Sequence, residues 1–83
     1  MAQTYGINIQ KMAFPDNTDI QVGDTVTWTN GMNMSHTVTA QDGQFDSGVL
    51  GKGQSFSQVF TAAGVIGYQC QIHPNMVGRI TVS

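Results

Sequence analysis

The residue types best suited to chemistry stand close together near the end of the chain. Cys70, His73 and Met76 are each separated by two residues, and Cys70 is the only cysteine. Thiolate, imidazole and thioether are soft or borderline ligands, and together they suit copper. A trigonal set of one cysteine and two histidines with a weak axial methionine needs a second histidine, and the chain has one other, His36. Such a site therefore requires a fold that brings His36 to the C-terminal stretch.

The spacing of these residues also predicts a local shape. An extended strand advances by ~3.3 Å per residue, so Cys70 and Met76 would lie far apart if the segment were extended. Pro74 and Asn75 are turn-forming residues placed between His73 and Met76. We expect Cys70 to end one strand, the following loop to wrap around an ion, and the last strand to begin at residues 77–78.

The length and the cysteine count favour a small domain with an additional source of stability. The 83 residues predict a single domain, residues 1–83. A chain this short buries only about 60% of its unfolded surface, and small folds usually add disulfides, a metal or a partner. One cysteine excludes an internal disulfide, which leaves a metal or a partner. A structural module with a free, buried cysteine that packs as a small apolar residue is the alternative.

Charge is sparse and forms no cluster. Charged residues make up 10% of the chain, against about 25% in a typical domain. Lys11, Lys52 and Arg79 are scattered, which argues against nucleic-acid binding. No apolar run is long enough to span a bilayer. The first residues lack the basic and apolar regions of a signal peptide, so we expect either a cytoplasmic protein or a mature form with a new start methionine.

Short alternating runs between turn signals predict an all-β Greek-key sandwich of about seven antiparallel strands without substantial helix. The clearest strand is residues 25–29, where Val26 and Trp28 should face the core. His36 opens another strand, at the end of the sandwich where the C-terminal loop should lie. The expected strands are residues 4–10, 19–22, 25–29, 36–40, 54–60, 65–70 and 78–83. The other residues expected to face inward are Ile7, Ile9, Phe56, Phe60, Ile66, Tyr68, Cys70, Ile80 and Val82.

The donor set restricts the kind of metal site. Zinc can take one cysteine and two histidines, but methionine is a poor zinc ligand. If the protein fills all four positions, no site remains for a substrate, whereas catalytic metal sites keep a vacancy. The residues therefore favour electron transfer over an oxidase or a hydrolase.

The chain resembles a small cupredoxin, or blue copper protein, of the plastocyanin/amicyanin type from residue 7 to residue 82. The motifs that carry the resemblance are VGDTVTWTN (residues 22–30), HTVT (36–39), FDSG (45–48) and YQCQIHPNM (68–76) followed by VG. The spacing Cys-x-x-His-x-x-Met resembles the short amicyanin-type loop. The resemblance implies a cupredoxin-like fold and one type 1 copper ion that shuttles electrons between Cu(I) and Cu(II). It also implies His36, Cys70 and His73 as equatorial ligands, Met76 as the axial ligand, and a periplasmic or otherwise extracytoplasmic mature protein.

Two positions depart from the family pattern. Many members carry asparagine after the first histidine, where its side chain ties the two ligand loops together; here the residue is Thr37. We expect the backbone N–H of Thr37 to donate to the Cys70 sulfur. Many relatives have proline before the second histidine; here it is Ile72, whose N–H could add a second hydrogen bond to the thiolate. On that basis Ile72→Pro is predicted to lower the reduction potential.

The resemblance also indicates how the protein meets its partners. It implies that His73 lies near the surface and is the exit for electrons. We expect a monomer in which Met32, Met34 and Pro74 surround His73 and form an apolar patch where transient redox partners dock. A copper carrier or storage protein with a Met-rich Cu(I) site is the alternative function, since Met12, Met32 and Met34 are expected beside the site.

Overall fold

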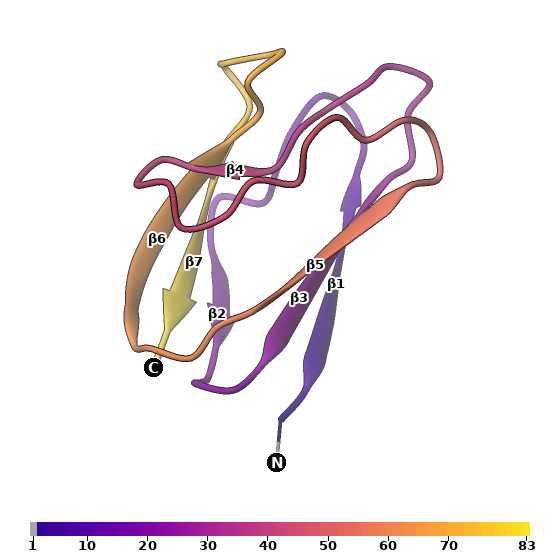
Figure 1. Ribbon diagram of the computed structural model, residues 1–83. Coiled ribbons are helices and arrows are strands. Elements are labelled where there is room, and N and C mark those ends of the chain that lie inside the picture. Colours follow the sequence, from indigo (N-terminus) through magenta and orange to yellow (C-terminus); the bar gives the residue numbers. More distant parts are fainter. Residues whose placement is uncertain (1) are drawn as a thin grey trace.

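Two β-sheets pack face to face in the computed structural model, which describes residues 2–83 (Figure 1). The strands are β1 (Thr4–Ile9), β2 (Thr18–Ile20), β3 (Thr25–Asn30), β4 (Thr39–Ala40), β5 (Ser55–Val59), β6 (Gly64–Gln69) and β7 (Val77–Val82). Residues 2–83 contain no helix, and thus none long and apolar enough to cross a membrane. The prediction of an all-β sandwich with seven strands is confirmed.

One sheet has the order β1-β3-β5 and the other β2-β7-β6-β4. The pairs β3–β5, β6–β7 and β4–β6 are antiparallel, as expected. The pairs β1–β3 and β2–β7 are parallel, which corrects the expectation of antiparallel strands throughout. The chain crosses to the other sheet for β2 and then returns, so β1 and β3 run in the same direction.

β3 confirms the predicted alternation. Val26 and Trp28 are fully buried, whereas the threonines between them face outward. The hydroxyls of Thr27 and Thr29 pair with two serines of β5 at 2.7 and 2.8 Å. Successive side chains of a strand point to opposite faces, so β3 presents an apolar face to the core and a hydroxyl face to solvent.

The core is built around the Trp28 indole. Its ring centroid lies 5.2 Å from that of Tyr68, 5.9 Å from Phe45 and 6.0 Å from Phe56. Phe56 is half-buried. The other residues predicted to face inward are buried: Ile7, Ile9, Phe60, Ile66, Tyr68, Cys70, Ile80 and Val82.

The strand predicted at residues 36–40 is shorter than expected, because only β4 at its end belongs to a sheet. His36 instead pairs with Leu50 through two backbone hydrogen bonds of 3.1 and 2.7 Å. The Val38 N–H donates to the Ser47 hydroxyl at 2.8 Å. Loop backbone and side-chain groups therefore replace a continuous strand neighbour as partners of this segment, and the regular strand pairing stops.

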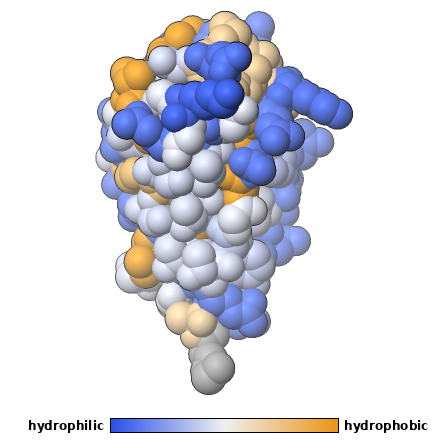
Figure 2. Space-filling model, turned by 90° about the vertical axis from the view of Figure 1, so that its right-hand side faces the viewer, coloured by the Kyte–Doolittle hydropathy of each residue, from blue (hydrophilic) through white to orange (hydrophobic). Residues whose placement is uncertain are grey.

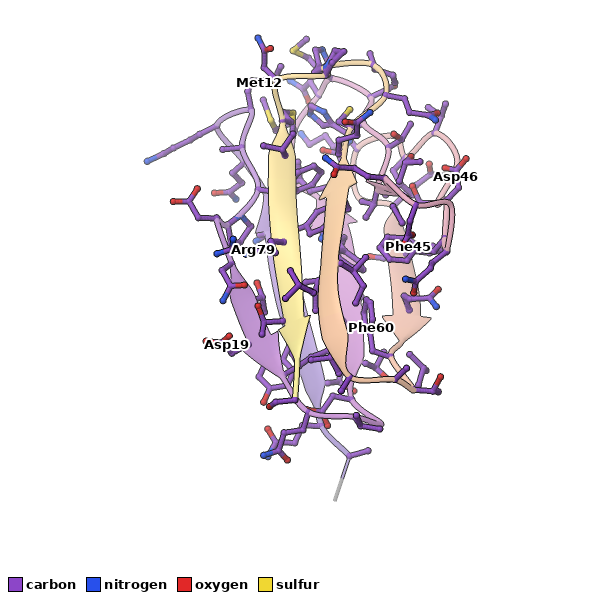
Figure 3. All side chains as sticks on the ribbon, turned by 90° about the vertical axis from the view of Figure 1, so that its left-hand side faces the viewer. Met12, Asp19, Phe45, Asp46, Phe60 and Arg79 are labelled. Carbon is purple, nitrogen blue, oxygen red and sulfur yellow. The ribbon has the colours of Figure 1, made fainter. Side chains whose placement is uncertain are left out.

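The loops that carry the candidate ligands lie together at one end of the sandwich. The loop after β3 and the loop after β6 lie at the upper end in Figure 1, while both chain ends lie at the lower end. The sulfur atoms also gather at the upper end in Figure 3. The fold thus brings residues 31–36 and 70–76 to the same place, as the sequence required.

Gly78 in β7 lies under the buried ring of Tyr68. A Cβ at Gly78 would come within 2.6 Å of the Tyr68 ring and 3.0 Å of the Phe14 Cβ. We predict that Gly78→Ala lowers the free energy of unfolding by about 1–3 kcal/mol, because the added methyl overpacks a filled core. Urea unfolding measures this change. Gly6→Ala is the matched control, since nothing lies within 4 Å of a Cβ there. Equal effects of the two variants would contradict the prediction.

Candidate metal centre

His36, Cys70 and His73 bring one donor atom each to a common point. The three donor atoms lie within 4.8 Å of one another. The Cys70 Sγ is 3.9 Å from the His36 Nδ1 and 3.8 Å from the His73 Nδ1. Metal bonds of about 2.3 Å to sulfur and about 2.0 Å to nitrogen, at an angle of about 120°, place these atoms about 3.7 Å apart. The side chains are therefore spaced to hold a single metal ion.

Met76 closes the loop that carries Cys70 and His73. Its N–H donates to the His73 carbonyl at 2.9 Å, and its carbonyl accepts from the Cys70 N–H at 3.0 Å. The Met76 side chain is buried, with 3% of its surface exposed. This geometry agrees with the predicted wrapping of the loop between Cys70 and Met76.

The two histidines differ in exposure. His36 is fully buried, and His73 is half-buried. Burial, and secondarily the nearby His73, lowers the pKa of His36. A lowered pKa keeps the His36 imidazole neutral near pH 7, and the neutral ring is the form that binds metals. His73 is then the donor closest to solvent.

Asn30 holds the backbone next to His36 through hydrogen bonds, and this role was missed from the sequence. Its fully buried side chain donates to the carbonyls of Met34 at 2.8 Å and Leu50 at 2.9 Å, and accepts from the Met32 N–H at 2.9 Å. Leu50 is the backbone partner of His36. The position could have been found, because Asn30 continues the inward alternation of Val26 and Trp28.

Thr37 joins the two ligand segments. Its backbone N–H donates to the Cys70 Sγ at 3.4 Å, as predicted. Its hydroxyl accepts from the Gln71 N–H at 2.8 Å. The connection that asparagine makes in many family members is thus made here by threonine.

The second hydrogen bond that the Ile72 N–H could add to the Cys70 sulfur is not present. Thr37 is the one backbone donor to the Cys70 Sγ in the part of the chain that the structure describes. Ile72 is 45% exposed and lines a pocket of about 480 Å³ together with Met12, His73 and three further residues of the loop. The structure therefore shows no hydrogen bond from the Ile72 N–H to the sulfur, and the Ile72 side chain is exposed.

This geometry revises the prediction for Ile72→Pro. Proline removes an N–H that the sulfur does not use, so we expect an unchanged reduction potential in the copper-loaded variant. Cyclic voltammetry of the variant and the parent protein measures the difference. A lower potential in the variant would mean that the second bond does form around the metal.

Comparison with known proteins places the chain in a family. The family model described as copper binding proteins, plastocyanin/azurin family, matches residues 1–83. Amicyanin from Paracoccus denitrificans is 38% identical over 87 residues, which cover 92% of this chain and 63% of the relative. Plastocyanin from Scenedesmus fuscus is 32% identical, with 82% of this chain and 83% of the relative covered. The chain spans 63% and 64% of the lengths of two amicyanin relatives.

Solved structures agree with this result. An oxidised amicyanin variant superposes with a TM-score of 0.89 at 33% identity, covering 95% of this chain and 81% of the other. The Cu(I) form of another amicyanin variant also gives a TM-score of 0.89, at 32% identity, with 96% and 82% covered. The soft donors gathered at the loop end of the sandwich fit the same metal. The chain belongs to the plastocyanin/azurin family of copper-binding proteins, and its cofactor is copper.

Proposed function

We propose that this protein is a type 1 copper electron-transfer protein that shuttles single electrons between redox partners. In this proposal residues 1–83 form a single copper-binding domain, with His36, Cys70 and His73 as equatorial ligands and Met76 as the axial ligand. The observation that carries the proposal is that three donor atoms from two separate loops converge within 4.8 Å of one another. Bound copper supplies a centre that gains and loses one electron.

The chain's own residues hold this arrangement with little freedom. His36 is fixed by its two backbone hydrogen bonds to Leu50, and Cys70 by its bond to the Met76 carbonyl. Asn30 satisfies its buried side-chain groups within the same loops. Ligands held by hydrogen bonds of the surrounding framework need little rearrangement when the charge of the metal changes, which favours fast electron transfer. Four protein donors would leave no open position for a substrate, which supports a role other than catalysis.

Partners dock, in this proposal, on the apolar surface around His73. The patch includes Met32, Met34 and Pro74, and Met34 is 48% exposed. Met12 and Ile72 extend it along the pocket beside His73. On the face in Figure 2 the largest apolar areas lie at the upper end, where these loops are. We further propose a monomer in a periplasmic or otherwise extracytoplasmic compartment, the location that the family resemblance implies.

A copper carrier or storage protein is the second candidate function. The observation that favours it is the hydrogen bond of 3.4 Å from the Met12 N–H to the Met32 Sδ, which brings two methionines together near the site. A carrier needs an exchangeable site that prefers Cu(I). The buried His36 and Cys70 favour a retained ion instead.

Addition of Cu(II) to the metal-free protein separates these functions. We expect an intense blue colour with a narrow copper hyperfine splitting, and a higher melting temperature. Binding to the folded state alone adds about 2.7 kcal/mol at a free copper concentration 100 times Kd. Cys70→Ser should lose the colour while circular dichroism still reports β-structure. Rapid reduction of the copper and its loss to a chelator would indicate a carrier.

Electron self-exchange between two copies tests the docking patch without a known partner. We expect Met34→Lys to slow self-exchange about tenfold, the equivalent of about 1.4 kcal/mol in the barrier, because two like charges then meet in an apolar interface. NMR line broadening in mixtures of both oxidation states measures the rate. Val65→Lys is the matched control, since Val65 is 64% exposed and lies at the far end of β6. A strong dependence of the parent rate on salt would contradict an apolar patch.

A further inference from the structure

A row of hydrogen bonds runs from the cysteine loop to an exposed carboxylate. The Gln71 N–H donates to the Thr37 hydroxyl at 2.8 Å, and that oxygen lies 3.0 Å from the Thr39 hydroxyl. Thr39 in turn donates to the Asp46 Oδ1 at 3.1 Å. Thr37 and Thr39 are buried, with 3% and 9% of their surfaces exposed. Figure 3 places Asp46 on a loop near the end of the sandwich that carries the sulfur atoms.

The chemistry of these groups fixes the direction of every bond. An ionised carboxylate only accepts, so the Thr39 proton points to Asp46. Thr39 has no second proton, so it accepts from Thr37. The Thr37 proton is thereby committed, and its oxygen is left to accept from Gln71. The three hydrogen bonds therefore all point the same way, with each donor on the Gln71 side and each acceptor on the Asp46 side. Hydrogen bonds aligned in this way polarise one another.

The far end of this row is itself held firmly. The Asp46 Oδ1 also accepts from the Gly48 N–H at 3.0 Å. The adjacent Phe45 is buried against Trp28, and its carbonyl accepts from the Ala40 N–H at 2.9 Å. The carboxylate therefore has a fixed position although its side chain is exposed.

The near end meets the cysteine at two points. Thr37 donates its N–H to the Cys70 Sγ and accepts the next N–H of the chain, that of Gln71, with its hydroxyl. In the β4–β6 pairing Thr39 lies opposite Gln69, and continuing this antiparallel register places Thr37 opposite Gln71. The sulfur and the hydroxyl thus replace the ladder bonds where the strand pairing ends.

We propose that Asp46, Thr39 and Thr37 form an oriented relay that positions the Cys70–Gln71 peptide and, through it, the thiolate. The three are positioning residues, because none of them is placed among the copper ligands. Asp46 orders the Thr39 hydroxyl, and Thr39 orders that of Thr37. Thr37 then holds the peptide that sets the direction of the sulfur. The inference rests on the proposed function only in its second readout, the reduction potential.

Amide hydrogen exchange in the metal-free protein is the first test. We expect Thr39→Val and Asp46→Ala each to accelerate exchange of the Gln71 amide about tenfold, because the Thr37 oxygen loses its fixed orientation. Amides of β3 serve as the reference for global unfolding. Thr39→Ser and Asp46→Asn keep a hydroxyl and an acceptor oxygen, so both should retain the protection. Asp46 is exposed, so its variants should still fold if Thr39→Val does not.

The reduction potential of the copper-loaded variants is the second readout. A Thr37 N–H that is held less firmly makes a weaker hydrogen bond to the thiolate, which stabilises Cu(II) relative to Cu(I). We expect the equilibrium between Cu(II) and Cu(I) to shift tenfold toward Cu(II), which lowers the reduction potential by about 59 mV for a one-electron couple. Thr27→Val, which removes a hydroxyl paired with Ser57 on the other sheet, should change neither readout.

Three results would overturn the relay. The first is unchanged Gln71 exchange in both Thr39→Val and Asp46→Ala. The second is equal acceleration in Thr27→Val. The third is a loss in Asp46→Asn as large as in Asp46→Ala, since the charge rather than the acceptor would then act. A failure of the electron-transfer proposal would appear in the copper spectra and leave the exchange results standing.

Discussion

The hydrogen bond from the Thr37 N–H to the Cys70 Sγ is the interaction on which the copper site depends. It joins two segments whose donor residues, His36 and Cys70, are 34 positions apart in the chain. The β4–β6 pairing supplies the register that brings these segments together. The β4–β6 pairing thus aligns the two ligand segments. Beyond the end of this pairing, the Cys70 sulfur accepts the Thr37 N–H in place of a backbone carbonyl. A bond between a backbone N–H and an anionic sulfur is also one of the means by which a protein tunes a copper potential.

The sandwich divides its stability and its function between different parts. The aromatic cluster around Trp28 fills the middle of the molecule with apolar surface, which contributes non-directional stability. The loop end is held by directional bonds instead, through the buried Asn30 and the buried hydroxyl of Thr37. Buried polar groups are costly unless satisfied, and those of Asn30 and Thr37 are satisfied. This end is therefore suited to fixing the orientation of side chains rather than to adding stability.

The donors and the main strands could be predicted from the sequence because both follow local rules. The spacing of Cys70, His73 and Met76 is visible in seven residues, and the alternation of Val26 and Trp28 follows from the pleat of a strand. The buried position of Asn30 follows the same alternation, but the shortened β4 and the hydrogen-bond partners of Asn30 could not be predicted in this way. They depend on side chains that bond backbone groups distant in the sequence, such as Ser47 to Val38. Such bonds have no period.

Thr37 illustrates why a substitution in a motif need not remove what the motif does. Asparagine can bridge two loops alone, because its side chain carries both an acceptor and donors. The Thr37 hydroxyl accepts a hydrogen bond from the Gln71 N–H, so its one proton needs another acceptor. That acceptor is the Thr39 hydroxyl. Thr39 then needs an acceptor for its own proton, and the Asp46 carboxylate is an acceptor that has no proton to donate. The loss of one amide group is thus offset by two further residues, so the local motif and its surroundings have to be read as a single network.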